Sequence, residues 1–173
     1  MAASIGQAQL LKDSFKRHVQ DESLPRIERC VELLTIEEIW ERFNAETPSI
    51  GNLIIHLCGN VRQWIIATLG GELDHRDRDS EFNERGPISK DELLNRIRNT
   101  VREAVTVVQN APPEALQQQH TVQGFQENGV DILVHVTEHF SYHTGQITLA
   151  TKIKKTVDLG YYAGQDLNAT GSD

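Results

Sequence analysis

The segment GVDILVHVTEHFSYHTGQITLA, residues 129–150, has the apolar spacing of a long helix and contains three histidines. The apolar residues that share one side of this helix are Ile132, Val136, Phe140, Ile147 and Ala150. Elsewhere the chain also follows the helical period, and the alternating pattern of strands joined by tight hairpin turns is missing. The sequence therefore predicts an all-α fold.

Two further long helices are expected in the first half of the chain. The first carries an apolar stripe over residues 10–34, and Pro25 either kinks it or opens its second half, because proline is tolerated in a first helical turn. Ser49 is a suitable N-cap for the second, which should extend over residues 50–69. Gly70-Gly71 then ends it.

Capping boxes mark two more helix starts. Residues 35–38, Thr-Ile-Glu-Glu, predict a short extra helix through Trp40 and Arg42 between the first and second long helices. Residues 89–92, Ser-Lys-Asp-Glu, predict a long helix that Pro112-Pro113 ends.

The connection over residues 70–88 is too long for a simple antiparallel hairpin. Extended chain covers ~3.3 Å per residue against ~1.5 Å in a helix, so this segment can return along the preceding helix. We therefore expect the second and third long helices to run parallel within a four-helix bundle. This bundle should be one domain over residues 1–162, followed by a small, polar and disordered tail over residues 163–173.

Composition narrows the classes of partner. The 173 residues suit one domain, and 17 basic against 25 acidic residues give a net charge of −8. This charge argues against nucleic acid and anionic membranes as partners. Cys30 and Cys58 form neither a disulfide framework nor a thiolate metal site, so we expect a reducing cytoplasm. We also expect no targeting or membrane-spanning segment.

The three histidines of the C-terminal helix cannot all bind one ion. His135, His139 and His143 follow one another at steps of four, and each step rises ~6 Å along a helix. Metal–nitrogen bonds of ~2.0–2.1 Å allow neighbours in this series to share an ion. The candidate pairs are therefore His135 with His139 or His139 with His143, and another ligand must come from a different helix.

His56 is the candidate for that further ligand. It lies within the mid-helix run Asn52-Leu-Ile-Ile-His56-Leu-Cys-Gly-Asn60, where a lone imidazole among apolar residues is costly. The remaining histidines, His18, His75 and His120, lie in polar surroundings. A hydrogen-bonded core histidine is the alternative for His56, and a polar helix face is the alternative for the His139–His143 pair.

Other metal and catalytic motifs do not match. A zincin needs glutamate inside its histidine pair, whereas Glu138 precedes His139. A ferritin-like di-iron site needs Glu-x-x-His on two helices, and the match over residues 72–75 lies in the loop that follows Gly70-Gly71. Phosphate-binding glycine loops and nucleophile elbows are also missing.

Two stretches carry a family resemblance that covers most of the chain. His139-Phe-Ser-Tyr-His143-Thr-Gly-Gln-Ile147 resembles the helix-four motif of the DinB-like (YfiT-like) superfamily, two histidines followed by Gly-Gln-Ile. Residues 49–64, SIGNLIIHLCGNVRQW, are similar to its helix-two motif with a single histidine. The resemblance is closest to a branch of uncharacterised role that carries a stretch like Arg76-Asp-Arg-Asp-Ser-Glu-Phe82.

The resemblance implies a fold and a ligand set. Members of the superfamily are four-helix bundles of up-down-down-up order, often dimeric, that bind nickel, zinc or a related divalent ion through three histidines. Carried over by position, it implies His56, His139 and His143 as ligands, and leaves His135 as a supporting or merely polar residue. Characterised relatives include thiol transferases that use bacillithiol or mycothiol and a mycothiol-dependent isomerase. A divalent metal, a low-molecular-weight thiol, a small-molecule substrate and a homodimer are therefore expected.

Three imidazoles leave a coordination position for water or a thiolate, as in catalytic sites. We expect a metal-dependent S-transferase acting on a thiol cofactor, or a hydrolase. The alternatives are a non-catalytic metal or small-molecule binding bundle, including one with a stress-response role, and a bundle whose histidines bind nothing.

Residues near the ligands have two readings each. Asn60 and Gln63 lie one and two turns from His56 and could orient a ligand or a metal-bound water, but interhelical hydrogen bonds would also explain them. Glu138 could act as an acid or base, although it points ~100° away from its neighbour His139. The charged Asp74–Phe82 loop could form a lid or a dimer contact, or could be a solvated, self-paired charge run.

Overall fold

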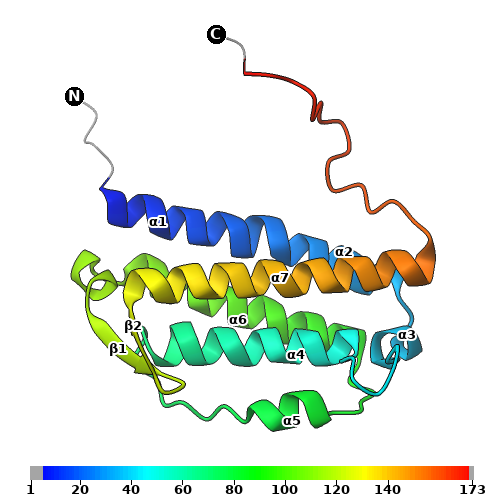
Figure 1. The fold of residues 1–173 in the computed structure, drawn as a ribbon, viewed down its shortest axis with the longest axis horizontal. Coiled ribbons are helices and arrows are strands. Elements are labelled where there is room, and N and C mark those ends of the chain that lie inside the picture. The colour runs from blue at the N-terminus through cyan, green and yellow to red at the C-terminus, as the bar shows by residue number, and fades with distance from the viewer. Residues whose placement is uncertain (1–5, 172–173) are drawn as a thin grey trace.

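The computed structural model describes residues 6–171 and is mostly helical, as expected (Figure 1). Its longest helical runs consist of α1 (Gln7–Lys16), η1 (Arg17–Ser23) and α2 (Leu24–Leu33); α4 (Ile50–Val61) and η2 (Arg62–Ala67); α6 (Lys90–Asn110); and α7 (Gly129–Lys155). Shorter elements are α3 (Ile36–Trp40), α5 (Arg78–Asn83), η3 (Pro113–Leu116), β1 (Gln119–Val122) and β2 (Phe125–Asn128).

The long helical runs lie side by side. α4 packs against α6 and α7, and α2 packs against the same two helices. Followed by colour in Figure 1, α4 and α6 run in one direction, whereas α1–α2 and α7 run in the other. The segment that carries α5 returns along the outside of α4 and packs against it. Two long helices, α4 and α7, are thus adjacent, and α5 covers the outer side of α4.

The expected helix starts are present. Thr35 and Glu38 form a complete capping box for α3, and Ser49 with Asn52 does the same for α4. The Ser89 side chain accepts a hydrogen bond from the Glu92 amide at the start of α6. Arg42, which we expected within the short helix, lies beyond its end, because α3 stops at Trp40.

Pro25 is accommodated without ending the first helical run. A proline ring clashes with the carbonyl four residues earlier and donates no hydrogen bond. The wider turns of η1 precede it, so that the Leu24 amide bonds to the Val19 carbonyl, five residues back. Pro25 then occupies the first turn of α2.

The connections contain two elements that the sequence did not predict. The first is a small antiparallel hairpin of β1 and β2 within the mostly helical fold, in which Val122 pairs with Phe125. Gln123 and Gly124 make its turn with φ of 51° and 82°. The strands are four residues long, too short to show alternation, and the turn lacks the usual Asn-Gly or Asp-Gly. The residue 70–88 connection also contains a helix, α5, which the sequence did not predict.

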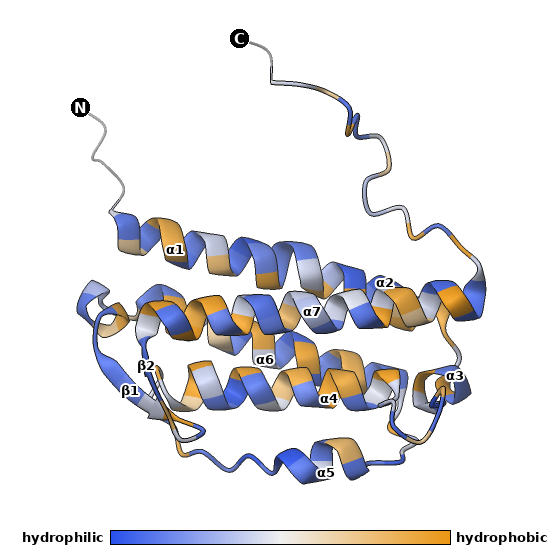
Figure 2. Ribbon diagram, viewed as in Figure 1, coloured by the Kyte–Doolittle hydropathy of each residue, from blue (hydrophilic) through white to orange (hydrophobic). Residues whose placement is uncertain are grey.

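The core fills the space between the long helices with apolar side chains from each of them. Figure 2 shows hydrophobic residues concentrated on these helices and hydrophilic ones in the connection around α5. The largest fully buried side chains include Phe15, Ile27, Ile54, Ile65, Ile97, Ile132 and Phe140. Among the described residues, no helix is both long and apolar enough to cross a membrane.

The C-terminal segment begins with a contact to the helices. Tyr161 exchanges hydrogen bonds with Thr148 and Cys30, which joins residues 156–162 to α7 and α2. The turns that follow, over residues 163–171, contain neither helix nor strand. Disorder of the tail stays a prediction, and its last two residues lie outside the described part of the chain. The first five residues, where we expect no targeting segment, also lie outside it.

Candidate metal centre

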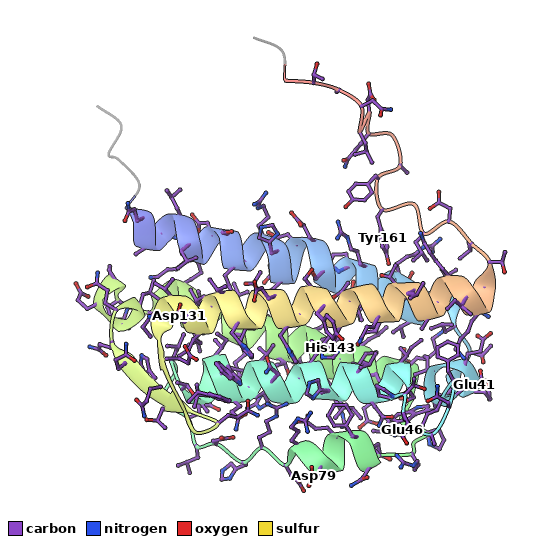
Figure 3. All side chains as sticks on the ribbon, viewed as in Figure 1. Glu41, Glu46, Asp79, Asp131, His143 and Tyr161 are labelled. Atoms are coloured by element: carbon purple, nitrogen blue, oxygen red, sulfur yellow. The ribbon has the colours of Figure 1, made fainter. Side chains whose placement is uncertain are left out.

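Three histidines from two helices meet between α4 and α7. One ring nitrogen from each of His56, His139 and His143 lies within 4.8 Å of the others. His56 comes from the middle of α4, and the other two follow one another by one turn on α7. Figure 3 labels His143, which lies where α7 faces α4. Of the two pairs that helix geometry allows, the structure brings His139 and His143 to His56.

The spacing of these nitrogens fits one ion. The Nε2 atoms of His56 and His139 are 2.9 Å apart, and the His139 and His143 ring centroids are 4.5 Å apart. Two nitrogens bound to one tetrahedral zinc ion are about 3.3 Å apart, given bonds of about 2.05 Å. Small side-chain adjustments would therefore allow all three imidazoles to bind one divalent metal.

Hydrogen bonds orient two of the three imidazoles. His56 Nδ1 lies 2.8 Å from Glu81 Oε2, and His143 Nδ1 lies 2.7 Å from Gln146 Oε1. A carboxylate only accepts, so His56 carries its proton on Nδ1 and donates it to Glu81. His143 likewise donates to the Gln146 amide oxygen. Both rings then expose an Nε2 lone pair, the form in which imidazole binds a metal.

The surroundings of His139 and His143 favour the neutral form of each imidazole. Burial, the largest cause, and the neighbouring His143, His56, His135 and Arg76 together lower the pKa of His139 to about 3. Burial also lowers the pKa of His143, although its bond to Gln146 opposes this shift. Neutral imidazoles are ready to bind a cation without first releasing a proton.

A protein family model matches nearly the whole of the helical fold. A family model described as "Protein of unknown function (DUF1572)" matches residues 7–160, a range that includes all three histidines. The chain belongs to this family. Comparisons with curated proteins and with solved structures gave no match.

A buried ion pair lies behind His56 in this DUF1572 chain. Burial raises the pKa of Glu81, but hydrogen bonds from His56 and Arg76 outweigh it, and the net pKa is lowered. Arg76 binds the carboxylate through both of its oxygens, at 2.8 Å and 3.1 Å. Gln63 in turn accepts a bond from Arg76 at 2.9 Å and donates one to Asp74 at 2.7 Å. Gln63 therefore supports the ion pair rather than the metal position.

The residue 74–82 loop, for which a lid, a dimer contact and a solvated run were all open, is folded against α4. The Asn52 side chain donates to the backbone carbonyls of Glu81 and Glu84, both at 2.9 Å. The Phe82 ring packs on the His56 ring with centroids 4.7 Å apart. Part of the charge run is thus buried and self-paired at the candidate centre.

His135 and Asn60 form a second layer one turn along the helices. The His135 ring stacks on Trp64 at a centroid distance of 3.8 Å, and Asn60 Nδ2 is 3.5 Å from His135 Nε2. Asn60 is 3% exposed, and its Oδ1 has no hydrogen-bond partner among the described residues. The Glu138 side chain, on the neighbouring face of α7, is exposed.

Sequence reasoning missed Glu81 and Arg76. Both lie in a charged loop, where an acidic residue normally faces solvent. The available signal was His56 itself, because a buried metal-binding imidazole almost always donates its second N–H to a carboxylate, a carbonyl or water.

A cavity of about 510 Å³ borders Arg76 and Glu81, but none of the three histidines lines it.

Proposed function

We propose that the chain is a metal-dependent enzyme of the DinB-like type, in which His56, His139 and His143 hold one divalent ion. The observation that carries the proposal is that one nitrogen from each of three imidazoles lies within 4.8 Å of the others. In two of these imidazoles, Nδ1 is hydrogen-bonded to an acceptor. Nickel and zinc are the ions expected. The parallel direction of α4 and α6 supports the up-down-down-up bundle order of that superfamily.

The donor set favours catalysis over a structural role for the ion. Structural zinc sites are usually closed by four protein ligands, whereas three histidines with an open position are typical of catalytic sites. A bound divalent ion would lower the pKa of a thiol or of a water molecule bound to it. The protein's own groups would orient the reactants. Asn60 Oδ1, which has no hydrogen-bond partner within residues 6–171, is available to accept a hydrogen bond from one of them.

Two reactions fit this arrangement. In an S-transferase, a thiolate attacks an electrophilic carbon, forms a C–S bond and displaces a leaving group. In a hydrolase, water attacks the carbonyl carbon of an ester or amide and forms a C–O bond, the bond to the alcohol or amine breaks, and the proton from water passes to that leaving group. The S-transferase is our first choice because of the resemblance to thiol-dependent relatives. A non-catalytic metal or small-molecule binding bundle is the second candidate function. The nearly buried Arg76–Glu81 ion pair behind His56 is compatible with catalysis and with binding alone.

Metal analysis tests the proposal first. The chain should be purified without a nickel column and assayed for metal, beside a His143→Ala variant. We expect about one ion per parent chain and loss of that ion in the variant. A parent chain that neither retains nor rebinds zinc, nickel or cobalt would overturn both metal-binding functions.

A substrate panel then separates the two functions. The metal-loaded protein should be incubated with low-molecular-weight thiols and a series of electrophiles, and thiol consumption followed. Metal-dependent consumption supports the transferase. Release of acid from ester or amide substrates without thiol supports the hydrolase. A loaded protein inactive in both assays supports the binding function. We also propose a homodimer, which sedimentation velocity would test.

A further inference from the structure

We infer that Glu81 is a positioning residue for the metal centre, which acts through His56 and is brought there by the folded α5 segment, defined as residues 72–84. The inference rests on the proposed metal binding and adds to it a residue outside the ligand set. Four observations carry it. The Glu81 carboxylate is buried, it bonds to His56 Nδ1, Gly59 leaves space for it, and hydrogen bonds anchor the backbone of its segment.

The carboxylate is buried against α4 rather than facing solvent. Glu81 is 5% exposed and the Arg76 side chain 4% exposed, so two charges leave water together. A buried ion pair of this kind seldom adds net stability, because the desolvation of both charges offsets their attraction. A stability role alone therefore explains the pair poorly.

The pair has a specific effect on His56. Arg76 occupies both carboxylate oxygens, and Glu81 Oε2 also lies 2.8 Å from His56 Nδ1. Because the ionised carboxylate can only accept, it selects the His56 tautomer that has a bare Nε2. That Nε2 is the atom that faces His139. A carboxylate behind a ligand imidazole also raises its basicity, which strengthens metal binding.

The helix provides the space for this carboxylate through a glycine. A Cβ at Gly59 would lie 1.8 Å from Glu81 Oε1 and 2.7 Å from its carboxyl carbon. Any side chain at this position would therefore displace the carboxylate. Gly59 lies in the interior of α4, where glycine lowers helix stability relative to alanine. The close approach of Glu81 gives a reason for this glycine.

Backbone anchors hold the α5 segment in register with His56. The fully buried Asn52, one turn before His56, donates to the carbonyls of Glu81 and Glu84. Arg42 donates to the carbonyl of Phe82, whose ring covers one face of His56. The segment therefore holds Glu81 at a fixed height along α4.

Metal affinity is the first test, measured by competition between the full-length protein and a chromogenic chelator for zinc. Glu81→Gln removes the charge and keeps the shape, and Gly59→Ala displaces the carboxylate without changing any ionisable group. We expect both variants to bind zinc about 10–100-fold more weakly. Glu72→Gln is the matched control, because Glu72 is exposed in the same segment and pairs with Arg62 at 3.4 Å. It should bind zinc within about twofold of the parent.

Two spectroscopic readouts separate positioning from stability. Long-range ¹H–¹⁵N spectra of the metal-free parent should show His56 protonated on Nδ1, and Glu81→Gln should shift it toward a mixture of tautomers. The visible spectrum of the cobalt-loaded protein should change in the same variant. A merely structural ion pair would alter the unfolding free energy and leave both spectra unchanged.

The outcomes are distinguishable from failure of the proposed function. If the parent binds no metal, the proposed function fails, although the tautomer measurement still tests the effect of Glu81 on His56. If the parent binds zinc and folded Glu81→Gln binds it as tightly, with the parental cobalt spectrum, the positioning role is overturned. Should Glu81→Gln not fold, Gly59→Ala decides, and parental zinc affinity in that variant overturns the inference.

Discussion

His139 Nε2 lies 2.9 Å from His56 Nε2, although 83 residues separate them along the chain. The contact fixes which turn of α7 faces His56. His143, one turn further on, also reaches His56, with ring centroids 5.0 Å apart, while His135 turns back toward Trp64. The histidines on either side of His139 therefore have different surroundings.

Matched substitutions at these two histidines should differ in effect. We expect His143→Phe to lose stoichiometric metal, because it removes a ligand. His135→Phe should keep the metal, because phenylalanine retains an aromatic ring to stack on Trp64. Metal content after gel filtration, with circular dichroism to verify folding, measures both. Loss of metal in His135→Phe alone would exchange the roles of the two residues.

The stability of the metal-free protein should depend on pH through His139. Its pKa in the folded chain is about 3, against 6.5 for an ordinary histidine. Below about pH 6.5 this histidine is protonated in the unfolded chain but stays neutral in the folded chain. The free energy of unfolding should therefore fall as pH drops from 6.5 toward 3. Urea unfolding at several pH values should give a shallower loss for His139→Gln, which does not titrate. Parallel curves for the two proteins would contradict the assignment.

Asn52→Ala should destabilise the fold and weaken zinc binding together. The oxygen of this buried amide accepts hydrogen bonds from Arg42 and from the Ser49 amide at the α4 cap. Its nitrogen donates to two carbonyls of the α5 segment. Loss of these bonds leaves at least two buried groups unpaired, which should cost about 3 kcal/mol in urea unfolding. Asn44→Ala is the control, because it removes a similar amide from an exposed turn and should cost under about 1 kcal/mol. Parental zinc affinity in a folded Asn52→Ala would separate the anchor from the metal centre.

Asn60→Leu should show a conflict between stability and ligand binding. Because Oδ1 of this buried amide is unpaired among the described residues, an apolar side chain of similar shape should leave the melting temperature unchanged or raise it. The cobalt-loaded variant should nevertheless bind 2-mercaptoethanol more weakly than the parent, as followed by its visible spectrum. A clear loss of melting temperature with unchanged thiol binding would mean that Asn60 has a packing role.

The sequence was most informative where the chemistry is local. Ser49 and Thr35 identify their helices through bonds to residues three positions away, so these helix starts were predictable from neighbouring residues. The candidate ligands on α7 were predictable as alternatives, because a helix repeats every 3.6 residues, but the choice between His135 and His143 depended on a family resemblance.

Contacts between distant segments were not predictable in this way. Glu81 reaches His56 across 25 residues, and this contact requires the path of a connection whose sequence shows only charge. The α5 helix within it has six residues and is stabilised by its contacts with α4 rather than by an apolar period of its own. The short β1–β2 hairpin is local and was missed for a different reason: its four-residue strands show no alternation, and its turn lacks the usual Asn-Gly or Asp-Gly.

The lack of a side chain at Gly59 has a consequence for sequence comparison. A Cβ there would overlap the carboxylate that follows it by 22 positions, the difference between 59 and 81. The two positions should therefore vary together among chains of this fold: glycine at the first where the second is glutamate, and larger residues at the first only where the second is shorter or absent. Such covariation would identify relatives with the same imidazole–carboxylate pair before any of their structures is known.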